Sequence, residues 1–280
     1  GWPVRLLGLP SPLSWSGQSD SLVWPFRLVA LASPIRFSGQ SATQSFSRTF
    51  LPEIAKAIDD GLTNSSVRAM ILTGEGKFFS AGADINAFAK AIKDGDAPQL
   101  IRDLTGVLHP LLVRMRQSPT ICVAALNGAC AGGGLGLALA CDLRIGSPSA
   151  KMAASYSGMG LSPDGGTTWL LPRLVGDQTA RQFFFENEIW SAEKAHQVGA
   201  IDAIVEHDSL LDSALASALK WSQWGNHTKE ATKHLLDVQS VQDFETHLKH
   251  ERTLIEAAGT TDAFKEGVTA FIEKRKPNFE

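Results

Sequence analysis

Strands alternate with helices along the first two hundred residues of this chain, and helices alone follow. Hydrophobic periodicity predicts strands over 26–31, 67–72, 120–126, 143–145 and 200–205. It predicts helices over 45–62, 97–115, 135–140, 165–171, 178–186 and 192–198. The pattern indicates an α/β body over 45–207 and a helical C-terminal region over 208–280, while residues 1–44 show no steady period.

The composition excludes several classes of protein. With 44% hydrophobic and 20% charged residues, 280 residues are typical of a globular chain with a sizeable core. The formal net charge of −3 argues against a nucleic-acid or anionic-membrane partner. No membrane span is predicted, and a cytoplasmic location is expected. Cys122, Cys130 and Cys141 have small apolar neighbours, so we expect buried thiols and neither a disulfide scaffold nor a zinc site.

Two glycine-rich turns, over 127–134 and 160–166, each join a strand to a helix. Backbone N–H groups at a helix N-terminus point outward, and glycine lets a ligand approach them closely. A pair of such groups from separate loops could hold one oxyanion, although tight packing alone also explains such turns. Neither turn has the spacing of a P-loop or of a dinucleotide-binding motif. In a third turn, over 77–84, Asp84 is expected to cap a short helix that begins at Ile85.

Several short motifs follow one another along the chain in the order that a known family shows, over 79–85, 125–134, 140–145, 160–164, 171–176, 191–201 and 264–275. Together they resemble the crotonase family, the enoyl-CoA hydratase/isomerase superfamily. The resemblance implies a spiral of ββα turns followed by helices that assemble a homotrimer or hexamer. It also implies an acyl-CoA thioester as substrate, with coenzyme A as part of that substrate and no metal or separate cofactor.

The family resemblance assigns roles to the turns. It implies that the N–H groups of Ala83 and Gly133 form an oxyanion hole around the thioester oxygen. The loop that contains Ala81, Asp84 and Ile85 would wrap the CoA, and Gly132 is a further residue expected to bind the substrate. Lys274 or Lys276 would reach a CoA phosphate, in this subunit or across a subunit boundary; the alternative for these two lysines is a solvated helix end.

Hydratases of this family use two glutamates, and neither is present here. Matched motif to motif, their positions are Gly136 and Tyr156. Glycine has no side chain, and a phenol has an ordinary pKa of about 10, so neither can activate water at neutral pH. Simple hydratase activity is therefore not expected.

Asp164 is the remaining candidate for the acid. It follows Pro163, where single-acid isomerases of the family place their base. One carboxylate suffices for an allylic shift, because it can take the proton at C2 and return it at C4. The leading prediction is thus an enoyl-CoA isomerase with Asp164 as base. The alternative is that Asp164 only caps the helix expected to begin at Gly165.

Other functions stay open. One is an enoyl-CoA hydratase with relocated acids, and another is a CoA-ester-binding homologue without activity. A third is an aryl-CoA dehalogenase, which needs a His as base and a Trp beside the nucleophile; His109 lies two positions from the expected site, and Tyr156 replaces the Trp. The acyl group is not determined, but a bulky or aromatic group could contact four residues, Phe88, His109, Tyr156 and Trp169.

Overall fold

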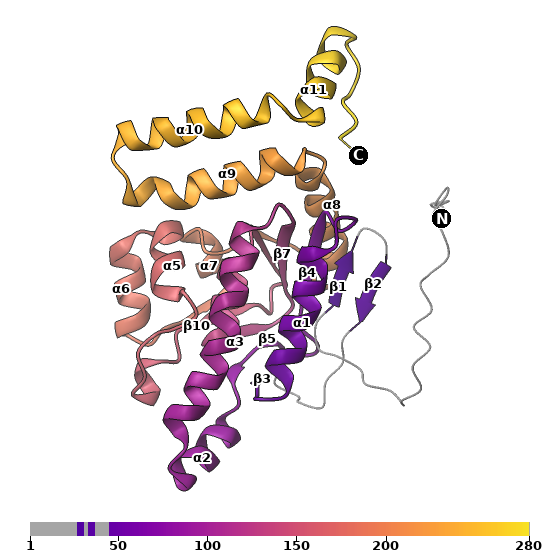
Figure 1. Cartoon of the computed structure of the whole chain (residues 1–280). Coiled ribbons are helices and arrows are strands. Elements are labelled where there is room, and N and C mark those ends of the chain that lie inside the picture. The colour runs from indigo at the N-terminus through magenta and orange to yellow at the C-terminus, as the bar shows by residue number, and fades with distance from the viewer. Residues whose placement is uncertain (1–26, 31–32, 37–44, 280) are drawn as a thin grey trace.

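A computed structural model describes residues 27–30, 33–36 and 45–279. The strand expected over 26–31 is found as β1 (Arg27–Ala30), which pairs antiparallel with β2 (Ser33–Arg36) and lies against β4. The ends of the expected strand, and most of the segment 1–44, lie outside the described residues. Figure 1 shows an α/β body with helices stacked at its C-terminal end.

A parallel four-stranded sheet forms the centre of the body. Its order is β12 (Ala203–Ile204), β9 (Leu143–Gly146), β7 (Ile121–Leu126) and β4 (Ala69–Thr73). Every residue of β4 and β7 is buried, which explains their continuous apolar sequences.

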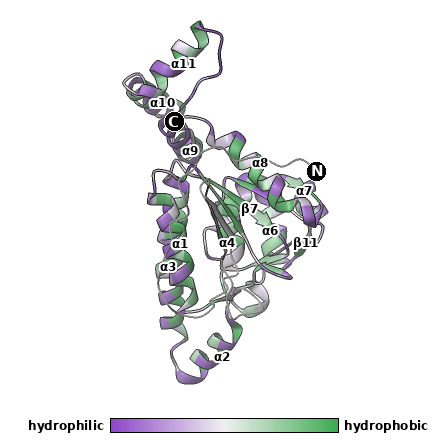
Figure 2. Ribbon diagram, turned by 90° about the vertical axis from the view of Figure 1, so that its right-hand side faces the viewer, coloured by the Kyte–Doolittle hydropathy of each residue, from purple (hydrophilic) through white to green (hydrophobic). Residues whose placement is uncertain are grey.

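Alternate residues of this sheet serve two hydrophobic clusters, as the period of a strand requires. Met70, Leu72, Cys122 and Ala124 face a cluster that includes side chains of α1 (Phe50–Thr63), α3 (Ala97–Gln117) and α4 (Gly133–Ala140). Ile71 and the other alternate residues pack on α8 (Leu210–Ser222). Figure 2 shows α1 and α3 on one side of β7, and α8 on the other. The first helix after residue 207 therefore completes the body.

A second sheet, which periodicity did not predict, includes part of the glycine-rich turn over 127–134. Its order is β11 (Ile189–Ser191), β10 (Lys151–Ala153), β8 (Ala129–Ala131) and β5 (Phe78–Ser80), with β11 antiparallel to β10. Each strand has only three residues, too few to establish an alternating pattern.

The helix expected over 45–62 begins later than predicted. Ser45 and Phe46 form β3, which pairs parallel with β6 (Gly82–Ala83), and α1 begins at Phe50. The Ser47 hydroxyl accepts a hydrogen bond from the Phe50 N–H at 3.1 Å, so the chain turns into the helix there. Pairing with a distant strand thus overrides the local helical pattern.

The remaining helices follow the predicted order closely. They are α2 (Ile85–Asp94), α5 (Thr167–Val175), α6 (Asp177–Phe185), α7 (Ala192–Gln197), α9 (Asn226–Val238), α10 (Phe244–Ala258) and α11 (Asp262–Ile272). Short 3₁₀ turns are η1 (Ser157–Met159), η2 (His207–Ser209) and η3 (Gln239–Val241). Of the described helices, none combines the length and apolar character that a membrane crossing needs.

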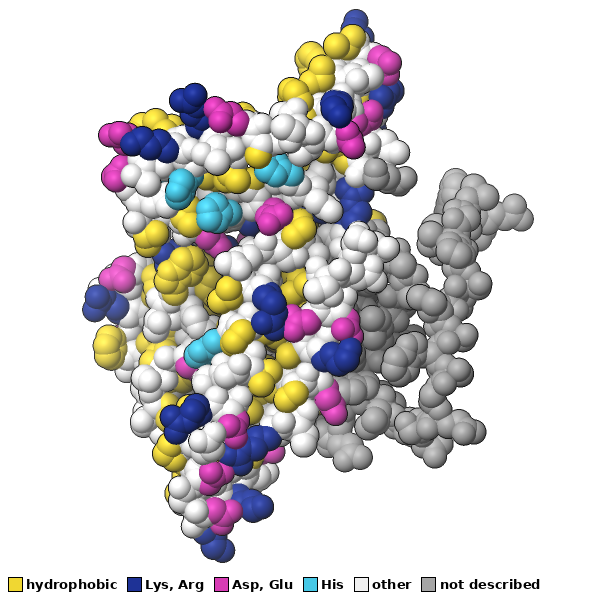
Figure 3. Space-filling view, in the orientation of Figure 1, with side chains coloured by type: hydrophobic (Ala, Val, Ile, Leu, Met, Phe, Trp, Pro, Cys, Tyr) yellow, Lys and Arg dark blue, Asp and Glu magenta, His cyan; other side chains and the backbone are white. Residues whose placement is uncertain are grey.

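The C-terminal helices carry much exposed apolar surface. Helix α10 runs along α9, and α11 projects beyond them (Figure 1). Figure 3 shows hydrophobic side chains along α11. Large exposed residues of this region include Phe244, Leu248, Ile255, Phe264, Val268, Phe271 and Ile272.

Candidate active site

The loop before α2 is held against the body by one buried amide. The side chain of Asn127, just after β7, donates hydrogen bonds to the carbonyl oxygens of Gly76 and Phe78, both at 3.1 Å. Its Oδ1 accepts a hydrogen bond from the Gly74 N–H at 2.9 Å. These bonds fix the path of residues 74–78 and so position β5 and β6.

The first glycine-rich turn meets this loop through backbone alone. A Cβ atom on Gly82 would lie 2.7 Å from the Ala131 carbonyl oxygen and 3.3 Å from the Gly133 nitrogen. Gly82 has φ +78 and Gly132 has φ +51, both in the region that favours glycine. Any larger residue at position 82 would push the turn over 77–84 away from the glycine-rich turn over 127–134.

The amides singled out in the sequence come from these two turns. The Asp84 N–H donates to the Phe46 carbonyl oxygen at 3.0 Å, so the preceding N–H, that of Ala83, points away from β3. Gly133 is the first residue of α4, where N–H groups lack a partner within the helix. Both residues line the same cavity.

This cavity has a volume of about 210 Å³ and a mainly apolar wall. Helices α2 and α3, the two turns and η1 enclose it. Its lining residues are Phe46, Leu51, Ala81, Ala83, Ile85, Phe88, Ile101, Leu104, Thr105, Leu108, Gly132, Gly133, Ser155, Tyr156, Met159, Leu161, Ser162 and Asp164.

Asp164 is the only carboxylic acid among the described lining residues. Its Oδ1 accepts a hydrogen bond from the Tyr156 hydroxyl at 2.9 Å. Burial, together with the charge of Asp164, raises the pKa of the Tyr156 phenol, which therefore stays protonated. Helix α5 begins at Thr167, whose N–H donates to the Asp164 carbonyl oxygen at 3.1 Å. Asp164 thus meets the start of the helix through its backbone, while its carboxylate faces the tyrosine and does not serve as a side-chain cap.

Gly136 packs against the loop that carries Asp164. A Cβ atom on Gly136 would lie 2.3 Å from the Gly165 carbonyl oxygen, well inside contact distance. The position at which related hydratases carry a glutamate therefore has no room for a side chain with this backbone.

His109 lies beside Asp164 on α3. Its Nε2 accepts a hydrogen bond from the Gly165 N–H at 3.3 Å and lies 3.8 Å from Asp164 Oδ2. It is absent from the lining of the cavity as described, so the expectation that it contacts the acyl group is not supported. Its observed contact is with the backbone next to Asp164.

Five of the other expected residues line the cavity: Ala81, Ile85, Gly132, Phe88 and Tyr156. Asp84 caps α2, as predicted, with its side chain accepting a hydrogen bond from the Asn86 N–H at 2.8 Å, but it is not among the lining residues.

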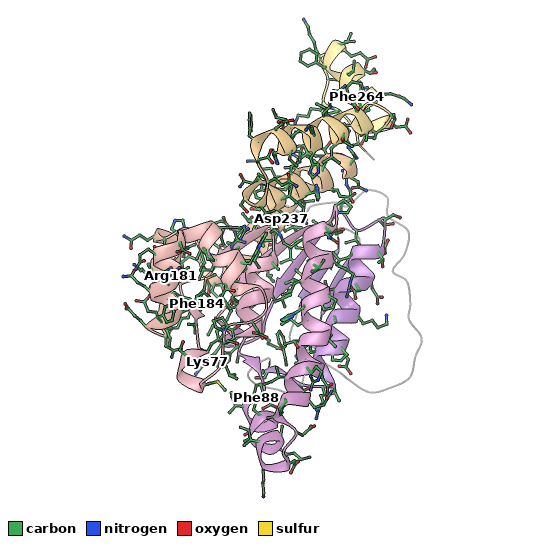
Figure 4. All side chains as sticks on the ribbon, turned by 60° about the vertical axis from the view of Figure 1, so that its left-hand side comes forward. Lys77, Phe88, Arg181, Phe184, Asp237 and Phe264 are labelled. Atoms are coloured by element: carbon green, nitrogen blue, oxygen red, sulfur yellow. The ribbon has the colours of Figure 1, made fainter. Side chains whose placement is uncertain are left out.

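Two residues lie away from the cavity. The expectation for Trp169 is wrong: its ring stacks under the Arg173 guanidinium, 3.3 Å from the ring centroid. Lys274 follows α11, and Figure 4 shows Phe264 of α11 at the opposite end of the molecule from Phe88 of the cavity. Lys274 is not among the described residues that line the cavity.

Sequence reasoning missed the leucines of the cavity. Leu104 and Leu108 lie on the buried face of α3 and serve both the core and the cavity wall. Helical periodicity could identify that face but could not separate the two roles. Met159 and Ser155 belong to the segment around η1, which no periodicity marks. No described group of three or more His, Cys, Asp or Glu side chains is arranged to hold a metal ion.

Comparison with known proteins shows to which family the chain belongs. The family described as enoyl-CoA hydratase/isomerase matches residues 32–280 of this chain. The chain belongs to the enoyl-CoA hydratase/isomerase family. This confirms the resemblance to the crotonase superfamily and the α/β fold with a helical C-terminal region.

Among similar members of this family, some are named isomerases and others hydratases. The 1,2-epoxyphenylacetyl-CoA isomerase of Escherichia coli (strain K12) is 33% identical over 235 residues, or 84% of this chain and 89% of that enzyme. A probable enoyl-CoA hydratase of Bacillus subtilis (strain 168) is 33% identical over 84% of this chain and 90% of that protein. The solved structure of Pseudomonas aeruginosa DspI has a TM-score of 0.82 and 30% identity, covering 95% of this chain and 100% of that one.

Proposed function

We propose that this family member shifts a double bond within an enoyl-CoA thioester, with Asp164 as the base. One observation carries the proposal: Asp164 is the only carboxylic acid among the described residues of a cavity that two amide-bearing turns also line. The two positions at which hydratases carry acids hold a glycine against backbone and a buried tyrosine.

The chemistry needs a base and a place for negative charge. Asp164 removes a proton from C2, and the electrons move toward the thioester oxygen, forming a dienolate. The N–H groups of Ala83 and Gly133 would donate hydrogen bonds to that oxygen, where one such donor is worth about 2.7–4 kcal/mol of the barrier. The same carboxyl then returns the proton at C4, so the product has the mass of the substrate and Asp164 is ionised again.

The apolar wall supports this assignment. It would exclude water from the dienolate and strengthen the hydrogen bonds to its oxygen. Leu104, Leu108 and Leu161 would surround the reacting carbons with groups that cannot donate or accept protons.

Mass spectrometry of acyl-CoA esters tests the proposal. We expect 3-enoyl-CoA esters to convert to 2-enoyl-CoA esters at unchanged mass, and Asp164→Asn to lower kcat by about 10²–10⁴-fold. Val113→Ala, on an exposed position of α3 outside the cavity lining, is the control and should leave kcat unchanged. Addition of the mass of one water to crotonyl-CoA, at a rate that Asp164→Asn does not change, would show a hydratase instead.

The other functions give different results. Release of chloride from 4-chlorobenzoyl-CoA would indicate a dehalogenase. Binding of CoA esters without turnover of any of them would indicate a homologue without catalytic activity.

A further inference from the structure

Tyr156 has a contact that neither the family match nor the proposed function explains. Its side chain is 5% exposed and its hydroxyl donates to Asp164 Oδ1 at 2.9 Å, with a longer contact of 3.3 Å to the Asp164 carbonyl oxygen. A buried hydroxyl needs a partner, and this one takes an oxygen of the only carboxylic acid among the described cavity residues.

The backbone before Tyr156 is shaped to make this contact. Ser155 has φ +56, a conformation that non-glycine residues rarely adopt, and it turns the chain from β10 into η1. Such strain clusters where function requires a particular placement. The Tyr156 carbonyl oxygen also accepts hydrogen bonds from the N–H groups of Met159 and Leu161, which hold the turn.

The second oxygen of the carboxylate has different surroundings. Among the described residues, no hydrogen bond to Asp164 Oδ2 is found, and His109 Nε2 lies 3.8 Å from it. That nitrogen accepts the Gly165 N–H, so its hydrogen bond is with the backbone and not with the carboxylate. The two oxygens of Asp164 are therefore inequivalent.

We propose that Tyr156 is a positioning residue that holds Asp164 by Oδ1 and leaves Oδ2 to carry the proton. The inference rests on the proposed function. The C2–H bond breaks as an O–H bond forms at Oδ2; that O–H bond then breaks as a C4–H bond forms. Tyr156 keeps its own proton throughout. Because one fixed oxygen makes both transfers, part of a label removed from C2 returns to the same molecule at C4.

Tyr156→Phe tests this with little change of packing. The ring lies 6.5 Å from that of Phe184, centroid to centroid, and the phenylalanine keeps this contact. We expect kcat to fall about 10–100-fold, the worth of a hydrogen bond to a charged group, with KM nearly unchanged. With a 3-enoyl-CoA deuterated at C2, the fraction of deuterium found at C4 of the product should also fall. A loosened carboxylate exchanges its proton with water before returning it.

Phe184→Leu is the matched control. It removes the ring beside Tyr156 but leaves the hydroxyl, so it should lower the unfolding temperature and leave label transfer as in the wild-type enzyme. The inference is overturned if the wild type transfers no deuterium to C4, or if Tyr156→Phe transfers as much as the wild type. It is also overturned if Tyr156→Phe and Phe184→Leu lose deuterium transfer to the same extent. The proposed function fails separately, if Asp164→Asn retains the wild-type rate.

Discussion

A Cβ atom added to Gly136 would lie 2.3 Å from the carbonyl oxygen of Gly165, the residue that follows the candidate base. The helix α4 and the Asp164 loop thus touch through backbone atoms. The absence of a glutamate at position 136 is consequently part of how the site is built, since a side chain there would displace Gly165.

Gly136→Ala should show this directly. We expect it to lower the free energy of unfolding by about 1–3 kcal/mol, as overpacking does, and to lower kcat because the loop moves. Gly106→Ala is the control: Gly106 lies within α3 with nothing near its Cβ position, and alanine there should stabilise by about 0.5–1 kcal/mol. Urea denaturation measures the stability of both variants, and isomerase assays measure their activity. Equal free energies of unfolding for Gly136→Ala and Gly106→Ala would contradict the prediction.

Two buried lysines of α9 should respond oppositely to the same substitution. Lys233 Nζ donates to the Met115 and Thr120 carbonyl oxygens and to Asp142 Oδ2, whereas Lys229 Nζ, also buried, has no hydrogen-bond partner among the described residues. Lys229→Met should raise the free energy of unfolding by about 1–3 kcal/mol. Lys233→Met should lower it by about 3–5 kcal/mol, because it leaves the Asp142 charge buried and unpaired. Chemical denaturation near neutral pH measures both.

The advantage of Lys229→Met should depend on pH. Burial, with the charges of Arg68 and Lys233, lowers the pKa of Lys229 from 10.5 to about 8. Between these values the unfolded chain holds a proton that the folded chain has lost, so the wild type gains stability relative to the variant as pH rises. Burial also raises the pKa of Cys122 and Cys130 to about 12, but both proteins share that effect. As pH rises, the denaturation midpoints of the wild type and of Lys229→Met should therefore converge. A difference that stays constant with pH would contradict the lowered pKa of Lys229.

The exposed apolar residues of α10 and α11 should mediate assembly. Phe271 is 85% exposed and Ile255 is 72% exposed, and apolar patches of this kind mark interaction sites. We expect light scattering to give three or six times the 30.0 kDa of one chain, and Phe271→Ser to shift the distribution to lower mass. Lys265→Ser, on the same helix, should leave it unchanged. A wild-type mass of one chain would exclude this.

Lys274 does not line the cavity of its own subunit, so we expect any contact with a CoA phosphate to cross a subunit boundary. If it contacts the 3′-phosphate of a neighbouring subunit's substrate, Lys274→Ala should raise KM about fivefold, the effect of an exposed ion pair of ~1 kcal/mol. Thioesters of dephospho-CoA lack that phosphate and serve as the control substrate, for which the variant and the wild type should have the same KM. The same increase with both substrates would place the lysine elsewhere.

The sequence predicts the central sheet well and the second sheet poorly. Buried strands such as β4 and β7 are short apolar runs, and turn residues such as Gly74 and Asn127 end them, which favours strands over helices. Strands β8 and β10 have three residues each, and their pairing depends on the path of the glycine-rich turns. The two-residue strand β3 lies within the helical pattern over 45–62, and it forms only because it pairs with β6, which is distant in the sequence.

For the candidate site, motifs singled out Asp164, Ala83 and Gly133, which line one cavity, but they could not show how Asp164 is held. The Tyr156–Asp164 hydrogen bond joins residues eight positions apart, and Ser155, just before Tyr156, has a left-handed backbone. Sequence patterns reveal neither feature. Trp169 illustrates the opposite error: its side chain turns to Arg173 although its helix follows the site loop directly.

The contact between Gly82 and the Gly132–Gly133 backbone limits how this enzyme can diversify. A substitution in either turn changes the spacing of both amides at once, so mutations there are poorly tolerated one at a time. The side chains of α2 and α3 that face the cavity, such as Phe88 and Ile101, carry no such constraint. New acyl groups would therefore be accommodated through those two helices, while the turns stay as they are.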